Sequence, residues 1–290
     1  MAIKLTDLPH EDLFVGPNNG CPGCGVAIAL RQATKVLGPR TMVTIPASCA
    51  ATIGGSNLAT AWKIPFFHAL FECSAAVASG IKAGLERQGK KDVVVVSWAG
   101  DAGSADIGFQ ALSGAAERNE DILHVCYDNE VAMNTGGQAS SSSPESVFTT
   151  LTPAGKPTGK KDMLAIMAAH RVPYVASASI GYPEDFVNKV ATARKVKGFR
   201  YLHVLAPCFR GWQIPAARTV EMARLAVDSG LWPLYELVDG KKRVTVEPAR
   251  RVPVKDYIRP QGRFAPLSDH DLEAIQRQVE AGQGCFGAKW

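Results

Sequence analysis

Four consecutive valines lead into a glycine-rich turn in the stretch Val93-Val94-Val95-Val96-Ser97-Trp98-Ala99-Gly100-Asp101-Ala102-Gly103. A continuous apolar run of this kind is typical of a β-strand in a parallel sheet that helices cover on both faces. Glycines at the strand end allow the backbone to approach a phosphate, and the helix expected next offers unpaired N–H groups. The stretch therefore predicts a buried parallel sheet with a ligand-binding turn at the carboxyl end of one strand.

Strand-like and helix-like segments alternate on both sides of this stretch. Strands are expected at 41–45, 93–97, 122–127, 172–176 and 201–205, and helices at 24–37, 69–87, 107–118, 162–170, 183–196 and 219–229. This alternation predicts an α/β fold with a doubly wound parallel sheet. The polar stretch 134–161, directly after a strand, is expected to be a binding loop. The alternation stops beyond Leu231, so we expect one domain over 1–230 and an extended tail over 231–290 with a helix at 267–279.

The composition is that of an ordinary globular protein. Hydrophobic residues make up 46% and charged residues 20% of the 290 positions. No apolar stretch approaches the roughly 18 residues that a transmembrane helix needs. The first residues lack the apolar core of a secretory signal, so we expect a cytoplasmic location.

The net charge of +5 is unevenly distributed along the chain. Residues 241–263 include eight basic and two acidic side chains and carry +6, so the rest of the chain carries about −1. The segment has a single aromatic residue, Tyr257, and no recognised nucleic-acid-binding module, so a nucleic-acid partner is not expected. An exposed or partner-facing segment is the preferred interpretation.

Seven cysteines occur in the chain, at positions 21, 24, 49, 73, 126, 208 and 285. An odd number without a secretion signal argues against a disulfide framework. Cys21 and Cys24 form a Cys-x-x-Cys pair at the start of an expected helix, and Cys49 and Cys208 follow at a distance. Four thiolates suit a [4Fe–4S] cluster. A thioredoxin-type redox pair and a structural zinc site are the alternatives that the spacing leaves open.

A second polar turn follows the next expected strand, in Asp128-Asn129-Glu130-Val131-Ala132-Met133-Asn134-Thr135-Gly136. The carboxylate of Asp101 in a phosphate-binding turn would repel the phosphate unless a divalent cation lay between them, so we expect Mg²⁺ there. Asn129 can supply an amide oxygen to the same ion, and Val131 a backbone carbonyl. Either turn alone is also typical of an ordinary sheet edge, but the two in β–α–β order are more specific.

The pattern Gly-Asp-x-Gly followed by Asp-Asn-Glu-x-x-x-Asn-Thr-Gly resembles the thiamine diphosphate motif of the pyruvate:ferredoxin oxidoreductase family. The resemblance extends over about residues 13–263 and matches the family's beta subunit, which has a thiamine-diphosphate-binding fold. It implies Mg²⁺ ligands at Asp101, Asn129 and the Val131 carbonyl, and a catalytic role for Asn134 near the reacting carbon. The cofactor-binding residues that it implies are Cys49, Gly100, Asp101, Ala102, Gly103, Asn129, Val131 and Asn134. Ala102 departs from the family, which usually has glycine there.

The same resemblance assigns the cysteines. It implies that a [4Fe–4S] cluster is held by Cys21, Cys24, Cys49 and Cys208. Cys73 and Cys126 lie in apolar segments and are expected to be core thiols, whereas no role is expected for Cys285. For His68 and for Glu72, which we expect in an apolar helix, a structural role is preferred to a catalytic one.

The implied reaction is the oxidative decarboxylation of a 2-oxo acid such as pyruvate, or of an aromatic 2-oxo acid such as phenylglyoxylate. Coenzyme A takes the acyl group, and electrons pass through the cluster to ferredoxin or another acceptor. One doubly wound domain forms half of a thiamine site, so the resemblance implies an alpha subunit with the pyrimidine-binding domain, and gamma and ferredoxin-like subunits. The alternatives are a non-oxidative thiamine diphosphate lyase subunit and a Cys₄-zinc binding or scaffold protein.

Two roles are open for the basic tail. It could pack on a partner subunit or dock an acidic electron acceptor. Packing is preferred because apolar residues, among them Trp232, Leu234, Tyr235 and Phe264, recur through this region.

Overall fold

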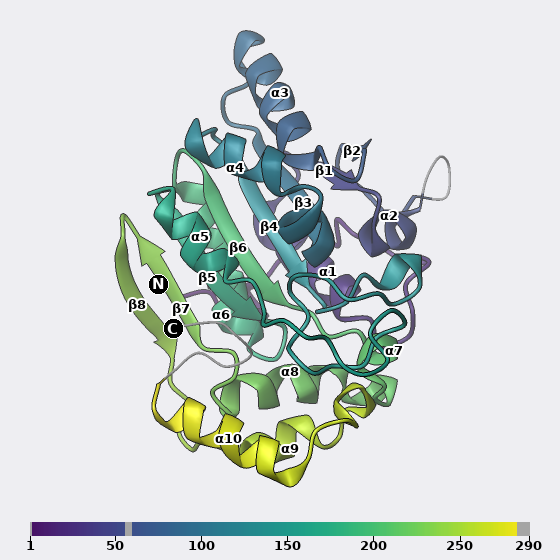
Figure 1. Cartoon of the computed structure of the whole chain (residues 1–290). Helices are drawn as coiled ribbons and strands as arrows, with labels where there is room; N and C mark the ends of the chain where they lie inside the picture. The colour runs from purple at the N-terminus through teal and green to yellow at the C-terminus, as the bar shows by residue number, and fades with distance from the viewer. Residues whose placement is uncertain (1, 56–59, 283–290) are drawn as a thin grey trace.

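The computed structural model of the chain describes residues 2–55 and 60–282. A single sheet runs through its centre, with helices packed on both faces (Figure 1). The eight strands lie in the order β2-β1-β3-β4-β6-β5-β7-β8. Neighbouring strands from β2 to β5 are parallel, whereas β7 and β8 are antiparallel additions beside β5. The predicted doubly wound sheet is therefore present, and it is extended at one edge.

The five predicted strands are all present within the parallel part of the sheet. Its strands are β1 (Thr41–Pro46), β2 (Phe66–Ala69), β3 (Val94–Gly100), β4 (Leu123–Asp128), β5 (Tyr174–Ser179) and β6 (Arg200–Leu205). Every residue of β4, β5 and β6 is buried, because helices cover both faces of these strands. The edge strand β2 was not predicted, since four residues are too few to show a period.

The helices form one layer on each face of the sheet. On one face lie α1 (Gly25–Leu37), α2 (Cys49–Gly54) and α6 (Pro183–Lys195), which bury their apolar sides in one core cluster. On the other lie α3 (Ser74–Arg87), α4 (Phe109–Glu117) and α5 (Met163–Ala169), which share a second core cluster. None of the helices in the described part of the chain combines the length and apolar character that crossing a bilayer requires.

The prediction of an extended tail beyond Leu231 is wrong. Strands β7 (Leu234–Val238) and β8 (Lys241–Val246) form a hairpin in the sheet, and α9 (Val254–Ile258) and α10 (Asp269–Glu280) pack with α8 (Thr219–Asp228). The prolines misled the prediction because they separate these short elements; Pro253, for example, is the N-cap of α9. The helix predicted at 267–279 is confirmed as α10.

The apolar residues of this segment are buried inside the chain itself. Trp232, Leu234, Tyr235 and Phe264 are at most 7% exposed and belong to the chain's own core clusters. They are therefore not available for contact with a partner. Packing of residues 231–290 on a partner stays a prediction.

Parallel strands place their carboxyl ends at one edge of the sheet. Strands β1, β3, β4 and β6 are consecutive in the sheet, so the turns that follow them meet there. These turns contain Cys49, the Gly100–Gly103 turn, the Asn129–Val131 turn and Cys208, respectively. The arrangement of the strands thus brings together four sites that are far apart in the sequence.

Candidate cofactor and cysteine site

The turn after β3 is tightly packed at its glycines. A Cβ atom at Gly100 would lie 3.0 Å from the Tyr127 hydroxyl, and one at Gly103 would lie 3.3 Å from the Phe71 ring. Residues Ala102–Asp106 form a single π-helical turn, a geometry found frequently at functional sites. Ala102 is not among the residues with positive φ, so its methyl group causes no backbone strain in this turn.

The Asp101 side chain is buried beside this turn, at 3% exposure of the residue. It accepts a hydrogen bond from the Ser140 hydroxyl. Burial and the nearby Asp128 carboxylate together raise the pKa of Asp101 to about 7. A divalent cation at this carboxylate would offset both effects, so the donor set suits Mg²⁺.

The turn after β4 is held by hydrogen bonds around Asn129. Its side-chain oxygen accepts from the Val131 N–H (3.3 Å), and its carbonyl accepts from the Trp212 indole N–H (2.8 Å). The Val131 carbonyl accepts from the Met133 N–H at 2.8 Å and keeps a second lone pair. Trp212 ends α7 (Phe209–Trp212), a short helix that the sequence analysis did not single out.

The two turns enclose one cavity of about 90 Å³. All eight residues predicted to bind the thiamine cofactor line this cavity. They are Cys49, Gly100, Asp101, Ala102, Gly103, Asn129, Val131 and Asn134. Asn134 lies at its rim, where the side-chain oxygen accepts a hydrogen bond from the Thr52 hydroxyl at 3.1 Å.

A second cavity of about 100 Å³ adjoins the first. Its lining includes Cys21, Cys24, Cys49 and Cys208, the four predicted cluster ligands. The other lining residues include apolar side chains, among them Val26, Ile53, Pro207 and Phe209, and an equal number of polar ones. In the described part of the chain, no group of three or more His, Cys, Asp or Glu side chains is arranged to hold a metal ion directly.

Helix starts hold three of these cysteines in place. Cys24 is the N-cap of α1, Cys49 is the first residue of α2, and Cys208 is the N-cap of α7, where its sulfur accepts from the Gly211 N–H at 3.5 Å. Burial, together with the nearby thiols of Cys208 and Cys24, raises the pKa of Cys49 to about 12. The four side chains are thus close enough to influence one another.

The cofactor cavity and the cysteine cavity share a wall. Cys49, Asn129, Met133 and Asn134 line both. A group bound in one cavity would therefore lie directly beside a group bound in the other.

The remaining predicted residues lie outside both cavities. His68 and Glu72 are exposed, and Glu72 lies in the turn before α3 rather than in an apolar helix, because that helix begins only at Ser74. Cys126 is a core thiol, as predicted, whereas Cys73 is only half-buried. Cys285 lies outside the described residues.

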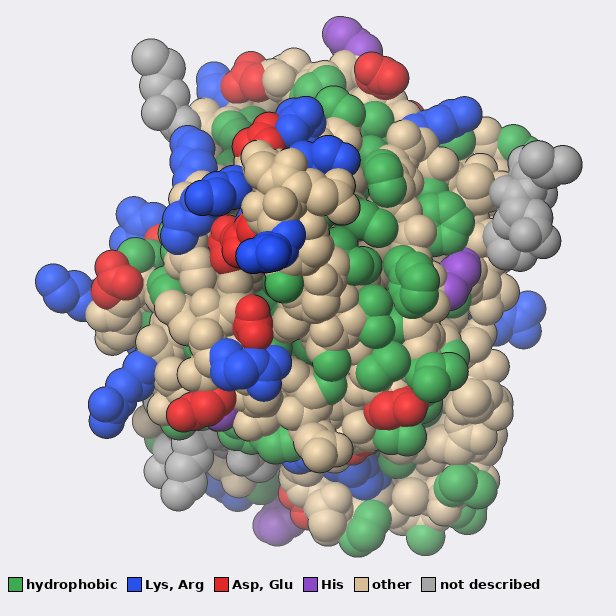
Figure 2. Space-filling view, turned by 90° about the horizontal axis from the view of Figure 1, so that it is seen from above, with side chains coloured by type: hydrophobic (Ala, Val, Ile, Leu, Met, Phe, Trp, Pro, Cys, Tyr) green, Lys and Arg blue, Asp and Glu red, His purple; other side chains and the backbone are tan. Residues whose placement is uncertain are grey.

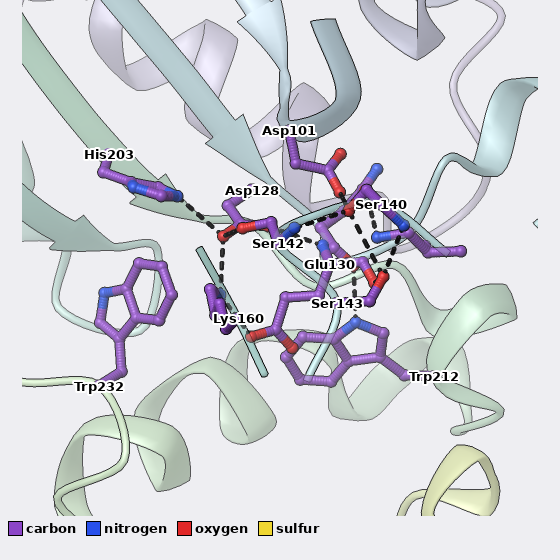
Figure 3. Close-up of polar contacts among 12 residues, drawn as sticks. Asp101, Asp128, Glu130, Ser140, Ser142, Ser143, Lys160, His203, Trp212 and Trp232 are labelled. Carbon is purple, nitrogen blue, oxygen red and sulfur yellow. Dashed lines mark hydrogen bonds and ion pairs between the residues drawn. The ribbon is translucent and has the colours of Figure 1, made fainter. Parts of the chain in front are cut away.

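A buried network of charges was missed in the sequence. Asp128 Oδ2 lies 2.8 Å from His203 Nε2 and 2.8 Å from Lys160 Nζ, and Lys160 also lies 2.8 Å from Glu130 Oε1 (Figure 3). The second Glu130 oxygen pairs with Arg263 at 2.6 Å. Burial alone would raise the pKa of Asp128, but Lys160 and His203 hold it well below its usual range. Asp128 and Glu130 stand in the second polar turn and Lys160 at the end of the polar loop, but their spacing in the sequence does not indicate that they pair.

Three serines of the polar loop 134–161 contact the two turns (Figure 3). Ser140 donates to Asp101, Ser142 donates to Asp128 at 2.5 Å, and Ser143 donates to the Glu130 carbonyl at 2.6 Å. The loop, predicted to bind a ligand, thus supports the acidic residues around the cofactor cavity.

Known proteins are similar to this chain over most of its length. The family model for the thiamine pyrophosphate enzyme, C-terminal TPP binding domain, matches residues 47–204. The chain is 47% identical over 279 residues to pyruvate synthase subunit PorB of Methanothermobacter thermautotrophicus, covering 94% of this chain and 97% of that protein. It is 41% identical over 288 residues to ketoisovalerate oxidoreductase subunit VorB of Pyrococcus horikoshii, covering 95% and 93%. The chain belongs to the 2-oxoacid oxidoreductase beta subunits.

This family membership confirms the resemblance inferred from the two turns. A solved 2-oxoglutarate:ferredoxin oxidoreductase from Magnetococcus marinus aligns with a TM-score of 0.59 over 77% of this chain and 80% of that chain. At 24% identity, that likeness is one of fold. The 2-oxoacid oxidoreductase subunit described here therefore has the thiamine-enzyme fold, and the matched range 47–204 includes every residue that lines the cofactor cavity.

Proposed function

We propose that this 2-oxoacid oxidoreductase subunit holds Mg²⁺–thiamine diphosphate in the cofactor cavity and a [4Fe–4S] cluster in the cysteine cavity. The observation that carries the proposal is the wall that the two cavities share. A cofactor that releases electrons would lie beside the group that accepts them. The reaction is the coenzyme A-dependent oxidative decarboxylation of a 2-oxo acid in the cytoplasm, with ferredoxin or another acceptor receiving the electrons.

The residues of the first cavity have distinct roles in this proposal. Thiamine diphosphate, when bound, supplies the nucleophilic carbon for decarboxylation. Asp101, Asn129 and the Val131 carbonyl hold Mg²⁺, and Ser140 orients the Asp101 carboxylate by donating to it. The tight turn at Gly100 and Gly103 lets the backbone approach the diphosphate, and Asn134 directs its amide toward the reacting carbon.

The cysteine cavity suits a cluster better than a single zinc ion. Zinc held by four thiolates in a tetrahedron needs sulfur atoms about 3.8 Å apart. No group of three cysteines among the described residues has an arrangement that would hold one ion directly, although four cysteines line the same cavity. A four-iron cluster spreads its four thiolate ligands more widely than a single zinc ion does.

Pyruvate or a similarly small 2-oxo acid is the proposed substrate. The relatives named for pyruvate are up to 47% identical to this chain, and those named for ketoisovalerate are up to 42% identical. An aromatic 2-oxo acid is the second candidate.

An alpha subunit with a pyrimidine-binding domain is the proposed partner, with gamma and ferredoxin-like subunits completing the complex. Phe71 lines the cofactor cavity, and the adjacent Leu70 is 69% exposed. Phe67 and Ile107 are 49% and 52% exposed. Figure 2 shows apolar side chains gathered over one half of the face seen from above. Exposed apolar side chains next to half of a cofactor site are what a subunit interface requires.

The test is metal and substrate analysis of the complex purified without oxygen. Cys21→Ala, Cys49→Ala and Cys208→Ala are each expected to remove iron and acid-labile sulfide from this chain, whereas Cys126→Ala is expected to retain both. Asp101→Ala should weaken the retention of thiamine diphosphate because Mg²⁺ loses its charged ligand. Pyruvate should bleach the iron–sulfur absorbance. Stoichiometric zinc without iron would contradict the cluster, and an iron-free complex that still decarboxylates would indicate a non-oxidative lyase.

A further inference from the structure

A buried chain of alternating charges lies beneath the turn with the proposed metal ligands. It runs Asp128, Lys160, Glu130, Arg263, with contacts of 2.8, 2.8 and 2.6 Å. Figure 3 labels its first three members. These four side chains are between 0 and 9% exposed. Burying four charges is costly unless each has a partner, so their pairing requires a specific arrangement of the turn.

Glu130 is the member that bears on the proposed metal site, because it stands between Asn129 and Val131. Its φ is +59°, a left-handed conformation that disfavours a side chain. Its backbone is fixed from both sides, since the N–H donates to Asp128 Oδ1 at 2.8 Å and the carbonyl accepts from Ser143 at 2.6 Å. Its two carboxylate oxygens are each paired with a different cation. Such an unfavourable conformation persists only where several surrounding contacts hold it in place.

Arg263 contacts this turn from the far end of the chain, 133 residues from Glu130. It belongs to the 3₁₀ turn η6 (Gly262–Phe264), and its guanidinium lies 3.8 Å from the centre of the Trp212 ring. The Trp212 indole in turn donates to the Asn129 carbonyl. Arg263 therefore acts on Glu130 directly and on Asn129 through Trp212.

The guanidinium of Arg263 is kept in place at some cost. Its Nε donates to Gln261 Oε1 at 2.8 Å, but its buried Nη1 has no hydrogen-bond partner among the described residues. An unpaired buried donor is destabilising. Arginine occupies this position despite that cost, and its contacts with Glu130 and Trp212 offset it.

We propose that Lys160 and Arg263 are positioning residues for the metal-binding turn: by clamping Glu130, they hold the Asn129 amide and the Val131 carbonyl where Mg²⁺ needs them. This inference rests on the proposed thiamine diphosphate site. Through Arg263, the C-terminal segment, which the relatives also possess, then supports the cofactor site although it does not touch the cofactor. Outer partners of metal ligands commonly change metal affinity about 10–100-fold when they are replaced.

The test measures the Mg²⁺ concentration that gives half-maximal binding of thiamine diphosphate to the assembled complex. Arg263→Met should raise it about tenfold or more, and Arg263→Lys, which keeps the charge, should raise it less. The matched control is Arg200→Met. Arg200 is as buried as Arg263 and is paired with Asp121, but it lies at the amino end of β6, away from the cavity. It should lower the melting temperature and leave the Mg²⁺ requirement unchanged.

The outcomes separate this inference from the proposed function. If the wild-type complex binds thiamine diphosphate without any Mg²⁺ dependence, the proposed site is wrong and the inference is overturned with it. If the wild type depends on Mg²⁺, but Arg263→Met and Arg263→Lys shift the half-saturating concentration no more than Arg200→Met, then the inference alone is overturned. Should Arg263→Met not assemble, Arg263→Lys decides between the two outcomes.

Discussion

Replacing Gly25 with alanine should disturb the cysteine cavity. Gly25 follows Cys24 at the start of α1 and packs against the backbone before Cys208. A Cβ atom at Gly25 would lie 2.7 Å from the Ala206 carbonyl carbon and 2.7 Å from the Pro207 carbonyl oxygen. Both contacts are with backbone atoms, so no rotamer change can relieve them.

The size of the effect follows from these distances. The shortest ordinary contact of a Cβ atom is 3.4 Å, so the two segments must separate by about 0.7 Å. Overpacking of this kind costs about 1–3 kcal/mol. Metal–ligand distances tolerate about 0.2 Å, so a shift that moves Cys24 away from Cys208 exceeds what a bound cluster would accept.

The measurement is iron and acid-labile sulfide per chain in the complex purified without oxygen, together with the melting temperature. Gly25→Ala should lose most of its iron and melt at a lower temperature. Gly84→Ala is the matched control, since Gly84 lies exposed in α3 with no atom within 4 Å of its Cβ position. It should retain its iron and gain up to about 1 kcal/mol in stability. Full iron and an unchanged melting temperature in Gly25→Ala would refute the reasoning.

Three further predictions concern other parts of the chain. Burial lowers the pKa of His124 to about 3. Between pH 6.5 and 3 this side chain therefore binds a proton in the unfolded state but not in the folded state. The free energy of unfolding falls there by up to about 1.4 kcal/mol for each unit by which the pH is lowered. His124→Gln should remove that part of the pH dependence in urea titrations; an unchanged slope would contradict the burial argument. Ala102→Gly should leave thiamine diphosphate affinity within about twofold of wild type, because Ala102 has no positive φ to relieve; a large gain measured by calorimetry would show that the methyl group crowds the cofactor. Val244 lies in β8 and is 49% exposed. If residues 231–290 pack on a partner, Val244→Asp should weaken assembly in size-exclusion chromatography; unaltered assembly would count against that packing.

The parallel core was predictable because its strands are buried on both faces. A strand such as β4, with every residue buried, leaves a continuous apolar run that needs no knowledge of its neighbours. The hairpin of β7 and β8 was not predictable in this way. Its second strand is largely exposed and basic, and it becomes a strand only because β7 is already in place beside it.

The cofactor cavity was predictable for a related reason, whereas the grouping of the four cysteines came from the family resemblance. Each cofactor turn follows a strand directly, and parallel strands carry their following turns to the same edge, so sequence position alone implied proximity. The charges beneath the cavity were not predictable. Arg263 stands in a basic run of the kind that usually faces solvent, and only the fold brings it to Glu130.

The added hairpin also decides how the sheet ends. An exposed outer strand is a template on which a strand of another chain can pair, which leads to aggregation. The outermost strand β8 begins with Lys241, Lys242 and Arg243, and all three are exposed. Bringing a second copy of this strand alongside would set these cations against one another, so the basic cluster protects the free edge of the sheet from self-association. At the opposite edge, β2 has only four residues, and such a short edge strand offers little backbone for another chain to pair with.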